Sequence, residues 1–162
     1  MQALLSLARD LPRRSLAPGE VLVTDGQPVP ALYVLLEGML RVEKRGVAIA
    51  TFAEPGTCVG EMSLLLGVPA TADVIATEAA VVAMVEDAPA MIADESDGLA
   101  VTLARLLATR LHVMTGYLVD LKEQYRDHEG GLGMVDTVLG SLMQAPGARS
   151  ELRSERDPEP EY

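Results

Sequence analysis

The sequence predicts an α+β fold, with a small β-barrel or jelly roll, flanking helices and a long C-terminal helix. Between residues 16 and 86, short apolar or β-branched runs alternate with glycine and proline at close intervals, which is typical of short strands joined by tight turns. After residue 87 the apolar residues recur at steps of three and four, which is typical of helix. A chain of 162 residues that is 49% hydrophobic can bury one substantial core.

The strands are expected where the apolar runs lie, at residues 21–24, 31–37, 40–44, 47–52, 57–59, 72–76 and 79–85. Turns are expected at Pro18-Gly19, Asp25-Gly26, Glu37-Gly38, Arg45-Gly46, Pro55-Gly56 and Gly67-Val68-Pro69. Residues 1–15 are expected to form an N-terminal helical cap, because Leu4, Leu5 and Leu7 give an amphipathic turn that ends at Pro12. The barrel is therefore assigned to residues 16–86.

Residues 87–129 are expected to form a short helix at 88–94 and a long helix that ends near residue 126, with Ser96 and Asp97 as its cap. The long helix carries a coiled-coil seam at Ala100, Ala104, Leu107, Leu111, Met114, Leu118, Leu121 and Tyr125. A second stripe, formed by Leu99, Leu103 and Leu106, is expected to pack on the barrel. The seam predicts a parallel homodimer, and a helix folded back on its own barrel is the alternative.

The last part of the chain is expected to hold little structure of its own. Residues 130–146 give one short amphipathic helix, through Leu132, Val135, Leu139 and Leu142. Residues 147–162 are expected to be a disordered acidic tail, because carboxylates outnumber arginines there.

Composition narrows the function classes. A net charge of -11 argues against a nucleic-acid partner, because phosphate backbones need a basic face. The single Cys58 gives no disulfide framework and is expected to be a small buried hydrophobe in a reducing cytoplasm. The N-terminus lacks a basic start for a signal peptide, and no apolar run has the length of a membrane span. The sequence therefore predicts a cytoplasmic protein that binds neither nucleic acid nor membrane.

The segment of residues 60–76 is the strongest candidate for a binding site. It contains a glycine, a short apolar helix, a Gly67-Val68-Pro69 break, and then small residues that lead into a β-branched strand. Such a turn can leave backbone N–H groups at a helix start, and Gly60 allows an anion to approach the backbone closely. The pattern therefore indicates a loop that fits a phosphate.

This segment resembles the phosphate-binding cassette of the cyclic nucleotide-binding domain family, in which Gly-Glu-x-Ala/Ser-Leu-Leu is followed by Pro-Arg-x-Ala-Thr/Ser. The residues that fall on the pattern are Gly60, Glu61, Ser63, Leu64, Leu65, Pro69 and Ala72. Residues 18–20, Gly26, 32–38 and 55–56 also follow the family's order and spacing. The resemblance covers residues 16–85 and implies the family's β-barrel.

The resemblance also implies a ligand site made of Gly60, Glu61, Met62, Ser63, Ala70, Thr71, Ala72, Asp73 and Thr115. Glu61 would accept a hydrogen bond from a ribose hydroxyl, and Thr71 and the backbone N–H groups of residues 70–72 would contact the phosphate. Thr115, on the long helix, would reach across the dimer to the purine. The local alternative for Thr115 is a hydrogen bond to its own helix backbone.

Two cassette positions depart from the family pattern. Ala70 stands where the family has the arginine that pairs with the phosphate, and Asp73 stands where a hydroxyl residue is usual. Loss of one partner of a buried charge pair costs about 2–5 kcal/mol. A carboxylate ~6 Å from a phosphate adds roughly 3 kcal/mol of repulsion at an effective dielectric of ~20. If strand alternation turns Asp73 outward, the repulsion is absent and only the loss of the arginine–phosphate pair weakens binding.

Three function classes follow. The first is a homodimeric regulatory sensor for a cyclic nucleotide or related small molecule, with weakened or changed binding. The second is a dimeric protein-interaction module with a vestigial pocket and an unknown protein partner. The third is an enzyme, either with a nucleophilic or acid–base site or with the metal site of a cupin barrel. The enzyme class is disfavoured, because His112 and His128 both lie outside the barrel and no catalytic or metal-binding cluster can be assembled from the sequence. No catalytic residue, metal or cofactor is therefore expected.

Overall fold

The computed structural model describes residues 2–94, 98–124, 138 and 140. The chain divides into two units, Met1–Leu106 and Leu107–Tyr162, and the long helix α4 (Leu99–Gln124) contributes to both. The expected helix at 130–146 (positions 138 and 140 excepted), the tail at 147–162, the cap at Ser96 and Asp97, and His128 lie outside the described residues.

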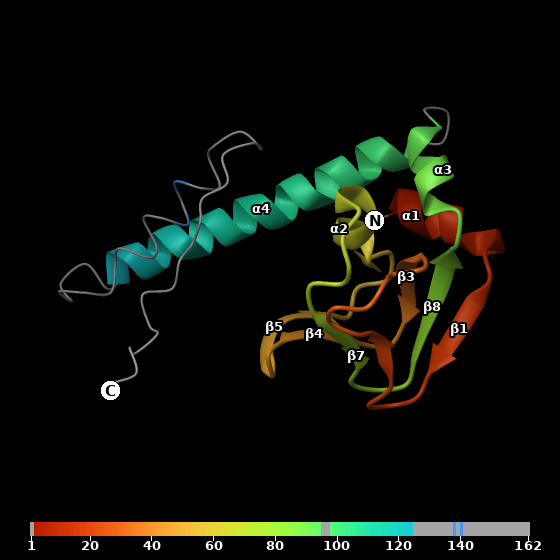
Figure 1. The fold of residues 1–162 in the computed structure, drawn as a ribbon, viewed down its shortest axis with the longest axis horizontal. Coiled ribbons are helices and arrows are strands. Elements are labelled where there is room, and N and C mark those ends of the chain that lie inside the picture. The colour runs from red at the N-terminus through yellow and green to blue at the C-terminus, as the bar shows by residue number, and fades with distance from the viewer. Residues whose placement is uncertain (1, 95–97, 125–137, 139, 141–162) are drawn as a thin grey trace, which may run out of the picture. The chain divides into compact units, whose positions relative to one another are not determined.

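Two four-stranded antiparallel sheets build the first unit (Figure 1). One sheet has the strand order β1 (Arg13–Leu16), β8 (Ala80–Val85), β3 (Leu32–Glu37) and β6 (Cys58–Val59). The other has the order β2 (Val21–Val23), β7 (Asp73–Ala76), β4 (Leu40–Lys44) and β5 (Val47–Phe52). Apart from the β4–β5 hairpin, consecutive strands lie in different sheets, as in a jelly roll, so the predicted fold class is confirmed.

The seven predicted strands are present, with ends within one residue of those expected, but strand β1 was not predicted. Residues 13–16 pair in antiparallel register with β8, from Arg13↔Ala83 to Leu16↔Ala80, so residues 13–15 belong to a strand and not to the expected helical cap. Only Leu16 of this strand is buried, so it carries no apolar alternation that would predict it. Backbone pairing with β8 holds the strand in place instead.

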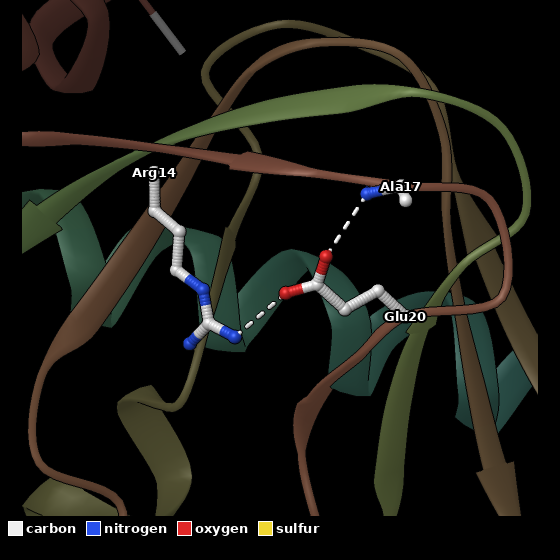
Figure 2. A network of polar contacts seen from close by, with 3 residues as sticks. All are labelled: Arg14, Ala17 and Glu20. Carbon is white, nitrogen blue, oxygen red and sulfur yellow. Dashed lines mark hydrogen bonds and ion pairs between the residues drawn. The ribbon is translucent and has the colours of Figure 1, made fainter.

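A polar network closes the turn from β1 to β2 (Figure 2). The Glu20 carboxylate accepts a 2.8 Å hydrogen bond from the Arg14 guanidinium and a 3.0 Å hydrogen bond from the Ala17 backbone N–H. The Ala17 hydrogen bond and, after it, Arg14 hold the pKa of Glu20 below its usual value of 4.5. The network therefore fixes the turn that carries the chain from one sheet to the other.

Alternation along the strands separates two cores. Tyr33 and Leu35 of β3 belong to the inner core, which lies between the two sheets. The buried members of the inner core are Leu16, Leu22, Val23, Ala31, Tyr33, Leu35, Leu40, Val59, Ala70, Val74, Ala76, Ala80 and Val82. Leu32 and Val34 belong to the outer core, between the first sheet and the helices. Its buried members are Leu4, Ala8, Leu32, Val34, Cys58, Ala83, Val85, Ala88, Leu99 and Leu103.

Helices supply the other side of the outer core. Helix α1 (Gln2–Leu7) and the 3-10 turn η1 (Ala8–Asp10) precede β1, and α3 (Ala88–Ala93) follows β8 at the same end of these paired strands (Figure 1). Cys58 is fully buried among them, as expected of a small hydrophobe. No helix in the described part of the chain is both long and apolar enough to cross a membrane.

The first two turns of α4 separate its two stripes. Leu99 and Leu103 are buried in the outer core, and Leu106 packs against it, which confirms that this stripe contacts the barrel. Ala100 and Ala104, the first two seam positions, are exposed. The part of the seam that belongs to the first unit therefore lies on the side of α4 that does not contact the barrel.

Candidate ligand-binding cassette

A six-residue helix, α2 (Glu61–Leu66), opens the cassette of residues 60–76 between two left-handed glycines. Gly60 has φ 93°, and a Cβ atom there would lie 3.0 Å from both the Ala31 carbonyl oxygen and Val29 Cγ1. Gly67 ends the helix with φ 65°, and its N–H donates to the Ser63 carbonyl. Both glycines are therefore needed for backbone geometry, and Gly60 also for space.

Two polar cassette residues point inward from α2. Glu61 is only 3% exposed, and Ser63 is also buried. The Ser63 hydroxyl donates to the Pro69 carbonyl at 3.4 Å, which ties the helix to the segment that returns to the sheet. Met62, in contrast, is 47% exposed, so the structure does not bring it together with Glu61 and Ser63.

The backbone of Ala70 is already occupied. Its N–H donates to the Gln27 carbonyl and its carbonyl accepts from the Gly26 N–H, each at 2.8 Å. In the structure this N–H, which was expected to contact a phosphate, is instead directed to the β2–β3 connection. The Ala70 side chain is 5% exposed and belongs to the inner core, so this position faces the barrel interior.

Asp73 faces away from that interior. Val74 and Ala76 belong to the inner core, so alternation along β7 places Asp73 on the opposite face of the strand. Its Oδ1 accepts a 2.8 Å hydrogen bond from the Asp25 backbone N–H. Of the two placements considered for Asp73, the structure has the outward one, and the repulsion that an inward carboxylate would exert on a phosphate does not arise.

Thr71 is exposed and Ala72 is half-buried at the exit of the cassette. The Thr71 carbonyl accepts a 2.6 Å hydrogen bond from the Lys44 ammonium, at the end of β4. No sequence pattern indicated Lys44, because it lies 27 positions from Thr71 and belongs to no cassette motif. The register Glu43↔Asp73 between β4 and β7 is what brings the two segments together.

Tyr33 is a second residue near the cassette that the motif did not indicate. It is 2% exposed in the inner core, and its Cδ2 lies 3.8 Å from the place where a Gly60 Cβ would stand. Burial raises the pKa of its hydroxyl, and the charge of Arg14 opposes this shift. Tyr33 therefore brings a neutral hydroxyl-bearing ring to the interior side of Gly60.

The remaining candidates have local roles in the described chain. The Thr115 hydroxyl donates to the Leu111 carbonyl at 2.8 Å, which is the helix-internal alternative. His112 is exposed on α4. Within the described ranges, no group of three or more His, Cys, Asp or Glu side chains could hold a metal ion.

The model of the cyclic nucleotide-binding domain family matches residues 13–89, which span β1 through the first residues of α3. A curated relative, Acetyltransferase Pat of Mycolicibacterium smegmatis, is 35% identical over 79 residues. These residues are 47% of this chain and 24% of the relative, so the chain spans about a quarter of that protein's length.

Two solved structures share the fold at comparable identity. The Catabolite Activator Protein of Thermus thermophilus matches with 28% identity and a TM-score of 0.61, over 75% of this chain and 60% of that one. The N-terminal domain of a transcriptional regulator from Streptomyces coelicolor matches with 25% identity and a TM-score of 0.52, over 70% of this chain and 84% of that one.

Proposed function

Because residues 13–89 belong to the cyclic nucleotide-binding domain family, we propose that this chain is a regulatory sensor that binds a cyclic nucleotide or a related organic phosphate at its cassette. It acts by binding rather than by catalysis, and it works as a homodimer. Its affinity for cyclic AMP and cyclic GMP is weaker than that of domains that keep the cassette arginine.

The inward pair of Glu61 and left-handed Gly60 is the observation that carries this proposal. The Glu61 carboxylate is 3% exposed, and its two oxygens can accept hydrogen bonds from more than one donor. Gly60 leaves the space beside Tyr33 free of a Cβ atom. A sugar hydroxyl can use such a carboxylate as an acceptor.

Weaker binding follows from Ala70. This position faces the inner core, where an arginine would direct its guanidinium toward a bound anion, and alanine leaves that anion without a bidentate partner. The loss corresponds to about 2–5 kcal/mol, or roughly 30-fold to several-thousand-fold in affinity. Asp73 adds no repulsion, because it lies on the outward face.

The homodimer rests on the seam of α4. In the described part of the second unit, residues 107–124, 138 and 140, no residue is buried, and Leu111 and Met114 are 45% and 56% exposed. A helix with a seam of this length is stabilised when a second copy covers it. We expect the dimer to form independently of ligand, since no seam position belongs to the candidate ligand site, and Thr115 lies next to the seam residue Met114 but not on the seam.

The test is a calorimetric titration of the dimer with cyclic AMP, cyclic GMP and 2′-deoxy cyclic AMP. Wild type should bind the ribose forms more tightly than the deoxy form, and Glu61→Gln should lose that discrimination. Glu54→Gln, which removes an exposed carboxylate outside the cassette, is the matched control and should behave as wild type. Equal affinity of wild type for the ribose and deoxy forms would contradict the role of Glu61.

A ligand-independent interaction module is the second candidate, and the occupied backbone of Ala70 favours it. With its N–H and carbonyl bonded to Gln27 and Gly26, this part of the cassette is closed on its own chain. A folded, dimeric wild type that binds none of these nucleotides at about 1 mM would support this candidate over the sensor.

A further inference from the structure

Lys44 lies at the end of β4, directly beside the cassette. Its ammonium donates a 2.6 Å hydrogen bond to the Thr71 carbonyl, one residue after Ala70. The β4–β7 ladder is regular from Leu40↔Ala76 to Glu43↔Asp73, so Lys44 is the next residue along the edge at which the cassette enters the sheet. The β4–β7 register therefore places Lys44 next to Thr71, which lies in the bend just before β7.

The same register sets the face on which Lys44 lies. Val42 packs against the inner core and its ladder partner Val74 belongs to it, whereas Glu43 and Asp73 lie on the opposite face. The register shift next to Val42 leaves Ile49 of β5 unpaired, so the alternation of β4 itself is unbroken. Lys44, two residues after Val42, thus continues the inward register at the open end of the strand, where its side chain is exposed.

The neighbouring carboxylates are engaged by other groups. Glu43 forms an ion pair with Arg41 at 2.6 Å, and Asp73 accepts the Asp25 N–H. Among the described residues, no carboxylate forms an ion pair with Lys44. The Thr71 carbonyl uses one of the ammonium's N–H donors, and the charge and the other donors stay available to an anion.

We propose that Lys44 is the residue that pairs with the anionic group of the cassette's ligand, the phosphate diester of a nucleotide. This inference rests on the proposed function and adds the cation that Ala70 does not provide. The lysine side chain is long and flexible, so the ammonium can turn from the Thr71 carbonyl to a phosphate oxygen beside it. Lysine binds as a point charge without the bidentate geometry of arginine, which gives a weaker and more salt-sensitive pairing.

The test compares Lys44→Gln, Lys44→Arg and Arg45→Gln by calorimetry with cyclic AMP and with adenosine, which lacks the phosphate. Lys44→Gln should weaken cyclic AMP binding about tenfold or more and leave adenosine binding unchanged. Lys44→Arg should stay within about threefold of wild type, because it keeps the charge. Arg45→Gln removes an equal charge from the adjacent, exposed turn residue and should have no effect.

The outcomes separate this inference from the function on which it rests. If wild type binds cyclic AMP and Lys44→Gln binds it equally well, Lys44 is not the phosphate partner, while the sensor function stands. If Lys44→Gln weakens adenosine as much as cyclic AMP, its role is structural and the inference is wrong. If wild type binds no nucleotide, both the sensor function and the role of Lys44 are wrong. If Lys44→Gln does not fold, the salt dependence of wild-type binding is the test instead. An affinity for cyclic AMP that stays constant when the salt is raised from about 50 to about 500 mM overturns the inference.

Discussion

The side-chain oxygen Oδ1 of Asp73 accepts a 2.8 Å hydrogen bond from the backbone N–H of Asp25, 48 positions earlier in the chain. Together with the two Ala70 hydrogen bonds, it ties the end of the cassette to the β2–β3 connection. An aspartate that would be unfavourable in a phosphate pocket thus stabilises the outer side of the strand.

We predict that Asp73→Ala destabilises the protein by about 1 kcal/mol, because an exposed backbone N–H loses its charged acceptor. Asp73→Asn keeps an acceptor oxygen and should lose less. Neither variant should change nucleotide affinity, since the carboxylate faces outward. Urea unfolding and calorimetry measure the two effects, and a gain in affinity for Asp73→Ala would place the carboxylate within reach of the ligand.

Gly38, in the turn between β3 and β4, is predicted to be the glycine least tolerant of substitution. It has φ 84°, and a Cβ there would lie 2.3 Å from the Ala79 carbonyl oxygen and 2.6 Å from Ala80 Cα. Gly46 has a similar φ of 76° but nothing within 4 Å of its Cβ position.

Gly46→Ala should therefore lower the free energy of unfolding by about 1–2 kcal/mol, which is the cost of the left-handed backbone alone. Gly38→Ala should cost more than this, because backbone atoms must also move. Thermal unfolding of the two variants isolates the steric contribution. Equal melting temperatures would mean that the turn relaxes freely around the new methyl group.

The network around Glu20 predicts a pH-dependent contribution to stability. The Ala17 N–H and Arg14 lower the pKa of Glu20 in the folded state below 4.5, so folding favours its ionised form. This stabilisation is fully present above the unfolded value and is lost as the pH falls through the folded value. Glu20→Gln should therefore melt below wild type at pH 7, and the difference should shrink below about pH 4. A difference that persists unchanged in acid would point to lost packing.

The seam of α4 predicts that Leu111→Asp combined with Leu118→Asp gives monomers, because each change places a carboxylate where the second copy would pack. Val113→Asp is the matched control, since Val113 is 65% exposed and lies off the seam. Light scattering of the full chain at high micromolar concentration measures the mass. Wild type that is already monomeric would contradict the homodimer.

The apolar runs and the turn glycines predicted seven of the eight strands, because both are local signals. It could not predict β1, where Arg13, Arg14 and Ser15 lack apolar periodicity and only pairing with β8 creates the strand. The cassette was located by its motif for a similar reason, since Gly60 and Gly67 need left-handed backbone that few other residues adopt.

The partners of the cassette were not predictable, because they come from distant segments. Neither the Lys44 contact with Thr71 nor the Asp25 contact with Asp73 has a sequence signal, since both depend on strand register. Register also decides the direction of Asp73, which the sequence left open. Local patterns therefore identified the loop, and strand pairing determines which charged side chains lie beside it and which way they face.

The last prediction concerns Ala70→Arg. The Ala70 side chain is 5% exposed in the inner core, so an arginine there either directs its guanidinium to a bound phosphate or remains buried without a partner. The variant should therefore be less stable than wild type without ligand and should gain at least about tenfold in cyclic AMP affinity.

Ala70→Met, which adds volume without charge, is the control that separates overpacking from pairing. It should also lose stability, but cyclic AMP should not restore it, whereas saturating cyclic AMP should raise the melting temperature of Ala70→Arg by more than that of wild type. Adding Asp73→Thr should give no further affinity, because Asp73 faces outward. An Ala70→Arg variant that folds, dimerises and gains no affinity would mean that the inner core fills the space the phosphate needs. That result would favour the interaction module over the sensor.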